Sequence, residues 1–458
     1  MKRIVLLLLV ISMSVLMFAS CSSNTGSLLT EEQEKTILDR DYGIEIRNEA
    51  IGLKNYKSNN LGFSIAGSSK DNELTDYIYG RFKEIGLKNV QKVPVELDGW
   101  NLSDMSFRFD CDCVEAGYQD YHNFGVYPSD FDFDSRSFQV INVGSLIKNP
   151  DSYVMSKGVL IDSVENIKEE VELAYSKGAV FVVYCDTESG SGTYKVDLEK
   201  GISNKIPVFV FSKINYDALV KEVELGKEIT VTIDGYSSLT ENITSDFIIG
   251  EIEGSKKYEY IYISANRDSI LEGFLSSKVP VGELLCLADT LVKEGYKPKY
   301  TIRFMVTTGQ EFGDINGGKN VGIRSYLNSD KINKKNIKYS IVLDGSKPLL
   351  ESLMTQYDIS SKSTELKELK EKLEKLNKSI EGKSLGYITQ IGEINSSYVT
   401  EALVWDEFGI PTIHQAEPIT SFYYSIEDTS KDDASIKLES DYCTYLVYYM
   451  REILNLLN

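Results

Sequence analysis

Histidine is the scarcest of the residues that usually carry catalysis, because the 458-residue chain contains only His122 and His414. Zinc sites commonly depend on imidazole side chains, and so do the pairs in which a base activates a serine or cysteine nucleophile. The sequence also lacks the Gly-x-Ser-x-Gly motif that marks a nucleophile elbow. The residues available therefore give little support to the common histidine-dependent hydrolase mechanisms.

Basic residues are also outnumbered, since 49 Lys and Arg face 69 Asp and Glu, for a net charge of -20 at pH 7. A surface this acidic repels a phosphate backbone, so we expect no nucleic-acid partner. Five cysteines remain besides Cys21, and an odd number does not complete a disulfide framework. We expect most of these five to be buried thiols: Cys111, Cys113, Cys185, Cys286 and Cys443.

Long apolar runs are missing except at the N-terminus, where two basic residues precede an apolar run over residues 4–18. This run is shorter than the ~20 residues of a spanning helix, and small residues follow it, as in secretory signals. The order resembles a bacterial lipoprotein signal in which Cys21 receives the lipid. It predicts a signal peptide over 1–20, a tether over 21–45 and a lipid anchor to the cell membrane on its extracytoplasmic face. An ordinary secretory signal cut nearby is the alternative.

Two stretches of the chain alternate between strands and helices, which predicts an α/β protein of about two to three domains. The first stretch has strands expected at 158–162, 178–184 and 206–211, and helices at 164–177 and 215–224. The second has strands expected at 258–265, 300–308 and 338–343, and helices at 282–293 and 441–457. A charged helix is expected over 363–377, with leucines at 366, 369, 373 and 376. That stripe fits a coiled-coil seam or, more often at this length, a helix docked on its own core.

Polar residues follow the strands of the second stretch, where ligands gather in parallel sheets. Asn266-Arg267-Asp268 follows the first of these strands, Gln310-Glu311 the next and Asp344 the third. A late strand over 410–413 precedes a segment that contains Tyr424. We expect these side chains to meet at one edge of the sheet.

This order resembles the M28 family of zinc aminopeptidases, in which strands end in His-x-Asp, Glu-Glu and Asp, and Tyr-His-Thr follows later. The resemblance implies a zinc-aminopeptidase-like (phosphorylase/hydrolase-like) fold, a three-layer α/β/α mixed sheet. Residues 138–235 resemble the protease-associated (PA) domain that many members carry as an insert. The implied domains are an M28-like peptidase domain over 46–130 and 241–458, with a PA-like α/β insert over 131–240.

The residues that the resemblance places at the site depart from the family's chemistry. Asn266 and Tyr424 stand where the family has histidine ligands, and Gln310 stands at the general base. The segment Lys278-Val-Pro-Val-Gly282 opens a helix and puts Lys278 at the metal-bridging aspartate. The ligand carboxylates Glu311 and Asp344 survive, together with the supporting Asp268.

Two carboxylates without imidazoles make a weak zinc site, and a glutamine amide does not accept a proton near neutral pH. Calcium would need further oxygens, such as those of Asn266 and Gln310. We favour a charge replacement in which Lys278, or Arg267 as second candidate, neutralises Glu311 and Asp344. The alternative is that Lys278 points into solvent.

The two histidines do not restore a zinc pair. His414 ends the late strand and is predicted to face the same cleft, but a single imidazole cannot replace two. His122 has no strand context near the cleft.

Three functions remain open. The first is a lipoprotein without catalysis and without a cofactor that binds a peptide or protein partner; its 29 tyrosines suit such a surface. The second is an active metallo-aminopeptidase with zinc in a remodelled site. The third is an envelope scaffold that acts through the PA-like domain.

Overall fold

The fold is described from a computed structural model of the chain. The structure describes residues 29–110, 120–121, 123–162, 165–185, 194–198, 201–345, 354–360, 364–381, 388–394, 400–416 and 440–457. The predictions for Cys21, Cys111, Cys113, His122 and Tyr424 lie outside the described residues.

The larger sheet is mixed and has the strand order β1-β11-β13-β12-β14-β17-β15-β16. Parallel pairing joins β13, β12, β14 and β17, whereas β1, β11 and β13 pair antiparallel. The strands are β1 (Lys88–Leu102), β11 (Tyr236–Ile252), β12 (Lys256–Asn266), β13 (Tyr300–Thr307), β14 (Ile337–Leu343), β15 (Met354–Ile359), β16 (Ile388–Glu393) and β17 (Thr412–Ala416), with the short β5 (Phe131–Asp132) paired to β11.

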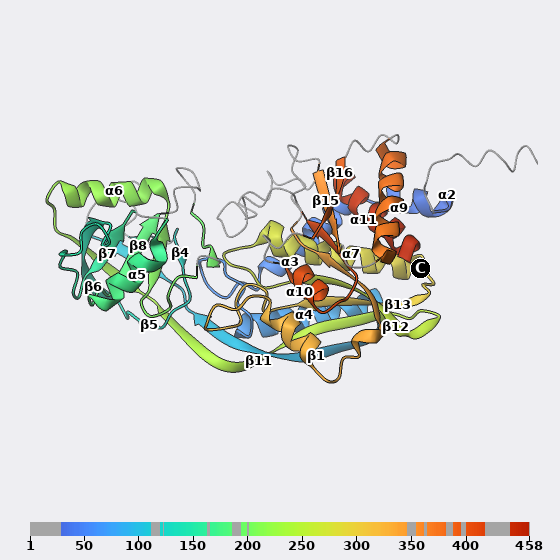
Figure 1. Cartoon of the computed structure of the whole chain (residues 1–458), viewed down its shortest axis with the longest axis horizontal. Coiled ribbons are helices and arrows are strands. Elements are labelled where there is room, and N and C mark those ends of the chain that lie inside the picture. The colour runs from blue at the N-terminus through green and yellow to red at the C-terminus, as the bar shows by residue number, and fades with distance from the viewer. Residues whose placement is uncertain are drawn as a thin grey trace, which may run out of the picture.

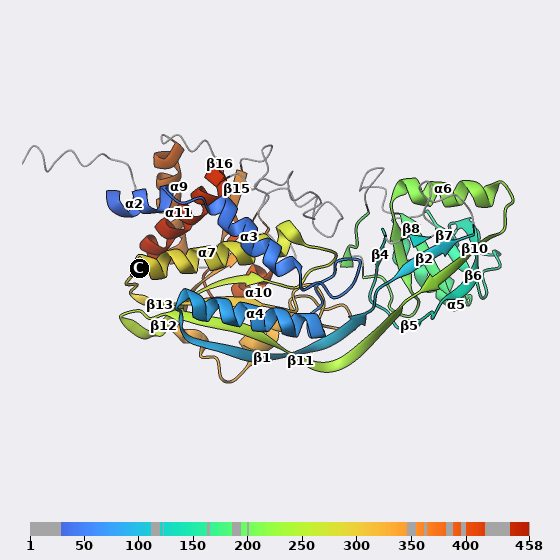
Figure 2. The ribbon, with the colours of Figure 1, turned by 180° about the vertical axis from the view of Figure 1, so that it is seen from behind.

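Helices cover both faces of this sheet, as Figures 1 and 2 show. Alternate strand residues point to opposite layers, since Ile261 and Ile263 pack with the helices of one face and Tyr262 with those of the other. One layer holds α2 (Glu31–Leu38), α3 (Tyr42–Lys54), α4 (Ser69–Ile85), the π-helix η3 (Phe274–Lys278), α7 (Val279–Lys293), α9 (Thr364–Glu381) and α11 (Ser440–Leu457). The other holds α8 (Val321–Asn328) and α10 (Glu401–Glu407), and the 3-10 turn η4 (Lys334–Asn336) leads into β14. The predicted three-layer α/β/α mixed sheet is confirmed.

A second sheet forms a separate domain at one end of the molecule (Figure 1), with the order β3-β2-β10-β6-β7-β8-β9-β4. Its core is rich in phenylalanine, and Phe107 packs edge-on against Phe124, Phe209 and Phe211. The elements are β2 (Ser106–Phe109), β3 (Asp120–Tyr121), β4 (Gly125–Val126), β6 (Arg136–Gly144), β7 (Gly158–Ile161), α5 (Ile167–Ser176), β8 (Phe181–Cys185), β9 (Val208–Phe211), α6 (Lys213–Glu224) and β10 (Ile229–Asp234).

This second domain is joined to the main sheet by the long antiparallel pair β1 and β11. Its sheet takes in strands from Ser106 onward, ahead of the predicted insert over 131–240, because Phe107 of β2 pairs with Ile233 of β10. Resemblance of this domain to a PA domain stays a prediction.

The first helix of the described chain corrects the tether predicted over 21–45. Thr30 caps α2 through a capping box with Gln33, and Ile37 is fully buried in the main core. Tyr42, at the start of α3, is fully buried as well. The folded body therefore includes residues 31–45, because α2 and α3 pack against α11 and α7.

The leucine stripe of α9 faces the protein's own core. Leu369, Leu373 and Leu376 are all buried against the main domain, and Leu373 lies beside Tyr449 of α11, whose hydroxyl donates to the Leu373 carbonyl at 3.5 Å. Three cysteines are buried free thiols, as predicted: Cys185, Cys286 and Cys443. Among the described residues, no helix is both long and apolar enough to cross a membrane.

We expect Leu373→Ala to lower the free energy of unfolding by about 2–5 kcal/mol, because the variant loses buried area and leaves a cavity. Chemical denaturation would measure this change, with the exposed neighbour Lys372→Ala as the control. Size-exclusion chromatography should show no change in oligomeric state. A changed assembly without lost stability would instead indicate an intermolecular seam.

Candidate functional site

Four buried polar positions meet at the carboxyl edge of the parallel strands. Asp268 follows β12, Gln310 and Glu311 follow β13, and Asp344 follows β14. The Asp268 carboxylate accepts hydrogen bonds from the backbone N–H of Glu311 at 3.0 Å and of Gln310 at 3.4 Å. Gln310 Nε2 donates to Glu311 Oε1 at 3.2 Å. The structure therefore brings together the side chains that the strand ends predicted.

Asn266 lies at the last position of β12 and is buried. Its Nδ2 donates to the backbone oxygen of Asp268 at 2.8 Å, whereas its Oδ1 has no hydrogen-bond partner within the described part of the chain. The Asn266 side chain is thus held by its amide nitrogen, and its Oδ1 is an acceptor without a described donor.

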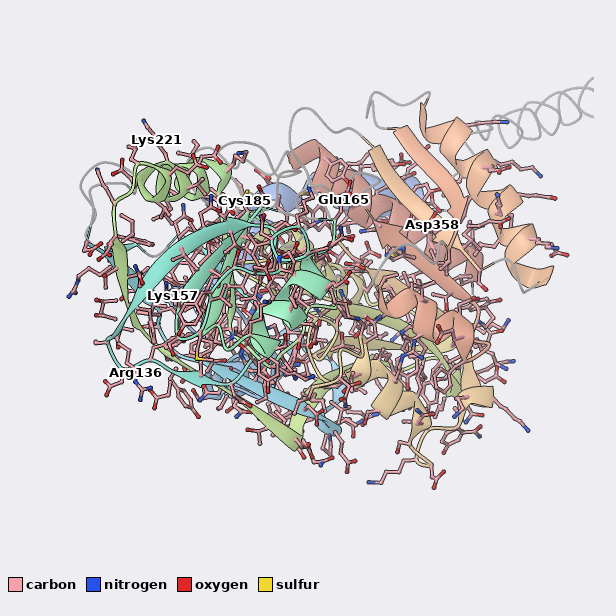
Figure 3. The ribbon with its side chains drawn as sticks, turned by 60° about the vertical axis from the view of Figure 1, so that its left-hand side comes forward. Arg136, Lys157, Glu165, Cys185, Lys221 and Asp358 are labelled. Atoms are coloured by element: carbon pink, nitrogen blue, oxygen red, sulfur yellow. The ribbon has the colours of Figure 1, made fainter. Side chains whose placement is uncertain are left out.

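His414 lies in β17 between two carboxylates. Its Nε2 is 3.4 Å from Asp344 Oδ2, and its Nδ1 is 3.7 Å from Oδ2 of Asp358, which Figure 3 shows on β15. Burial alone would lower the pKa of His414, but hydrogen bonds to Asp344 and Asp358 and the charges of both outweigh it and raise the pKa to about 9. His414 is therefore buried between two carboxylates that favour its protonated form.

Glu401 is a site residue that the sequence analysis missed. It is fully buried at the start of α10, directly after the helix-capping Thr400. Burial raises its pKa to about 8; the Thr307 hydroxyl acts in the opposite direction, and the charges of Asp268, Asp344 and Glu311 raise the pKa further. The segment 395–409 had no predicted element, and its only signal was a threonine and a glutamate before an apolar helical run.

Lys278 ends the π-helix η3 and is only 1% exposed, so the alternative that it points into solvent is wrong. Its Nζ donates to Ser64 Oγ and the Arg267 carbonyl, each at 2.9 Å, and to Ser269 Oγ at 3.2 Å. Short π-helical turns are frequent at functional sites. The ammonium is fixed by neutral oxygens near the strand ends, and its neutralisation of Glu311 and Asp344 stays a prediction.

Arg267 has a different carboxylate partner from the one predicted. Its Nε and Nη2 contact the two carboxylate oxygens of Asp71 at 2.8 and 3.0 Å, and both side chains are buried. Asp71 also accepts hydrogen bonds from the Ser245 hydroxyl and the Gly67 N–H. Arg267 thus closes a satisfied network between the start of α4 and the end of β12, away from Glu311 and Asp344.

The donors at this site do not fit a pair of zinc ions. Among the residues that the structure describes, no three or more His, Cys, Asp and Glu side chains are placed to hold a metal ion. The buried Lys278 stands at the position that the family resemblance gives to the bridging aspartate, and the Gln310 amide donates to Glu311. Zinc needs deprotonated ligands, and these groups are hydrogen-bond donors. The calcium alternative, which uses the oxygens of Asn266 and Gln310, stays a prediction.

A narrow cavity of about 60 Å³ adjoins the site between the two domains. Tyr127, Leu198 and Ile202 line it from the second domain, and Glu311 and Phe312 line it from the loop after β13. Its walls are largely apolar, and a site carboxylate lies at its edge. At this volume the cavity suits only a small apolar group next to a polar or cationic one, since sites for drug-sized ligands measure about 300–1,000 Å³.

A mixed sheet with polar residues at its carboxyl edge is the architecture of zinc aminopeptidases, and the comparisons with solved structures agree. A peptidase M28 precursor from Shewanella amazonensis is 16% identical, with a TM-score of 0.65 over 93% of this chain and 96% of that one. A zinc aminopeptidase from Bacillus subtilis is 16% identical, with a TM-score of 0.59 over 88% and 94%. A putative peptidase from Clostridium acetobutylicum is 13% identical, with a TM-score of 0.57 over 93% and 83%.

Residues 248–443 match the sequence model of peptidase family M28. This match covers less than half of the chain, and at these identities the structural likeness establishes the fold alone. No curated protein sequence matches the chain.

We expect Asp71→Asn to lower the free energy of unfolding by about 3–5 kcal/mol, because Arg267 would remain buried without its counter-charge. Denaturant titration would measure this loss. The control is Glu73→Gln, two residues along, which removes an exposed ion pair with Lys70 and should cost about 0–1 kcal/mol. Equal effects of the two variants would contradict the role given to the Asp71 network.

We expect stability to fall as pH rises from about 5 to about 9. The folded pKa of Glu401, about 8, and of His414, about 9, both exceed their ordinary values of 4.5 and 6.5. In this range the folded state holds more protons than the unfolded state, so raising the pH favours unfolding by a few kcal/mol, of order 1.4 per pKa unit. Urea titrations at several pH values would measure it, and Glu401→Gln and His414→Asn should each flatten the slope. A slope of the opposite sign would contradict both assignments.

Proposed function

We propose that the chain is an M28-fold binding protein that holds a peptide or a segment of a protein partner without hydrolysing it. We further propose that lipid on Cys21 anchors it to the outer face of the cell membrane. The observation that carries the loss of catalysis is the buried Lys278 ammonium, which stands where the family resemblance places the metal-bridging carboxylate.

Lys278 is fixed and cannot readily move aside. Hydroxyl groups and a carbonyl surround its Nζ, and its side chain is 1% exposed. A divalent ion bound beside it would face a like charge in a medium of low dielectric constant, which is costly. Gln310 at the general-base position leaves no proton acceptor for a water molecule there.

Binding is supported by the cavity between the domains. Phe312 and Ile202 offer apolar walls from opposite sides, and Glu311 lies at the edge. Asn204 Nδ2 donates to the Ile315 carbonyl at 3.2 Å, which ties the two walls together. A peptide with an apolar side chain next to a cationic group fits this combination of surfaces.

The proposal predicts that the chain, purified in the presence of zinc, holds far less than one zinc per molecule and releases no amino acid from peptide substrates. Elemental analysis and an aminopeptidase assay with and without a chelator would check both. Zinc near two per chain, or turnover that the chelator abolishes, would establish instead the active metallo-aminopeptidase.

Binding would be checked by screening a peptide library against the immobilised chain and measuring the hits by calorimetry. We expect Ile202→Asp to weaken a selected peptide at least about tenfold, or ~1.4 kcal/mol, because it places a charge in the apolar wall. Lys227→Asp, an exposed position outside the cavity lining, is the matched control. Peptides that bind both variants as they bind the parent would rule out this cavity as the binding site. Assembly lost on deletion of the second domain would favour the envelope scaffold.

A further inference from the structure

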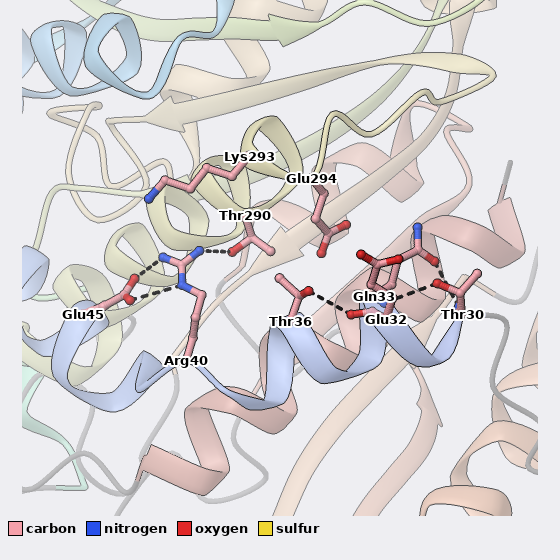
Figure 4. Close-up of a pocket in the computed structure, with 9 residues that line it drawn as sticks. All are labelled: Thr30, Glu32, Gln33, Thr36, Arg40, Glu45, Thr290, Lys293 and Glu294. Atoms are coloured by element: carbon pink, nitrogen blue, oxygen red, sulfur yellow. Dashed lines mark hydrogen bonds and ion pairs between the residues drawn. The ribbon is translucent and has the colours of Figure 1, made fainter.

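A second pocket lies between α2, the start of α3 and the end of α7, at the end of the main domain away from the second domain (Figure 4). Its volume is about 570 Å³, which is within the range of small-molecule sites. Every side chain that lines it is polar or charged: three threonines, one glutamine, three glutamates and two basic residues. A ligand here must be hydrophilic.

The basic residues of the pocket are already compensated. Arg40 pairs with Glu45 and with Asp289, and its Nη1 donates to Thr290 Oγ1 at 2.9 Å. Lys293 Nζ lies 2.9 Å from the same Asp289. An anionic ligand would have to compete with these carboxylates, so the pocket is poorly suited to anions.

Glu294 has one carboxylate oxygen that lacks a hydrogen-bond donor within the described residues. Its side chain is 7% exposed, and Arg451 Nε holds Oε2 at 3.1 Å. Oε1 is buried and has no hydrogen-bond partner within the described residues. Leaving a buried carboxylate oxygen without a donor costs stability. Figure 4 shows the carboxylate directed from the end of α7 towards α2.

Glu32 supplies a second negative charge from α2. It lines the same pocket and is exposed, and the structure describes no hydrogen bond or ion pair of its carboxylate. The pocket thus combines a buried carboxylate and an exposed one, and threonine side chains line it as well. Such a set of acceptors suits a group that has several N–H donors and a positive charge.

We propose that this pocket binds a small ligand through a primary ammonium group, which is held between the carboxylates of Glu294 and Glu32. The chemistry corresponds to ethanolamine, either as a free small amine or as the headgroup of a phospholipid. The second source is close at hand if Cys21 is lipidated, because the pocket wall α2 begins shortly after that residue. This inference is independent of the cleft between the domains.

The first test compares ethanolamine with choline by calorimetry on the purified full chain. The two cations carry the same charge, but the quaternary choline has no N–H to donate. We expect saturable binding of ethanolamine and at least about tenfold weaker binding of choline. Equal affinities, or no saturable binding of ethanolamine, would overturn the proposal.

Variants assign the binding to this pocket. Glu294→Gln and Glu32→Gln should each weaken ethanolamine binding by about fivefold or more, whereas Glu31→Gln, on the same helix but outside the pocket lining, should not. Glu294→Gln could fail to fold because Arg451 loses its partner. In that case Glu32→Gln still tests whether ethanolamine binds in this pocket. Unchanged binding by Glu32→Gln would overturn the proposal.

Dihexanoyl lipids, used below their critical micelle concentration, distinguish a free amine from a phospholipid headgroup as the ligand. Binding of the phosphatidylethanolamine that is tighter than that of ethanolamine, with weak binding of the phosphatidylcholine, supports a lipid headgroup. Similar affinity for this lipid and for ethanolamine supports a free amine. Equal binding of the two lipids would contradict recognition of a primary ammonium.

Discussion

Burial of charge at the carboxyl edge of the main sheet is the constraint on which the rest of the site depends. Asp268, Glu311, Asp344 and Glu401 are held there with little access to water. Carboxylates in such a setting must be neutralised, protonated or given donors. The chain uses all three means: backbone N–H groups for Asp268, an imidazolium for Asp344, and a raised pKa for Glu401.

The same constraint separates this chain from an enzyme of its fold. In a zinc aminopeptidase the positive charge at the strand ends comes from the metal ions. Here His414 and Lys278 are positive side chains of the protein itself, built into a strand and a helix start. A fixed internal cation does not polarise a water molecule as a metal does, which is the physical basis of the loss of catalysis that we propose.

The two pockets differ in the same physical terms. The cavity between the domains is walled by apolar side chains and bordered by Glu311, so it can gain free energy from apolar burial. The pocket beside α2 is lined only by polar and charged residues, so recognition there rests mainly on hydrogen bonds and charge. One lies between the two domains and the other at the far end of the main domain, and they belong to different proposals.

The carboxyl-edge positions of Asp268, Glu311 and Asp344 followed from the sequence, because parallel strands present their ends on one edge whatever the details of packing. The α/β architecture and the helices α5, α6, α7, α9 and α11 followed from apolar periodicity. The α2 helix did not, since it buries a single residue, Ile37, on an otherwise polar surface.

The partners of the buried charges were decided only by the tertiary structure. Pairing of Arg267 with Asp71, and of His414 with Asp358, joins residues from separate elements, and no local spacing encodes such distances. Glu401 became a site residue because α10 packs its first turn beneath the strand ends. The sequence by itself determined that polar residues follow the strands of the main sheet, since parallel strands end on one edge. Three-dimensional packing decided which opposite charge meets each of them, because electrostatic partners are fixed by distance in space.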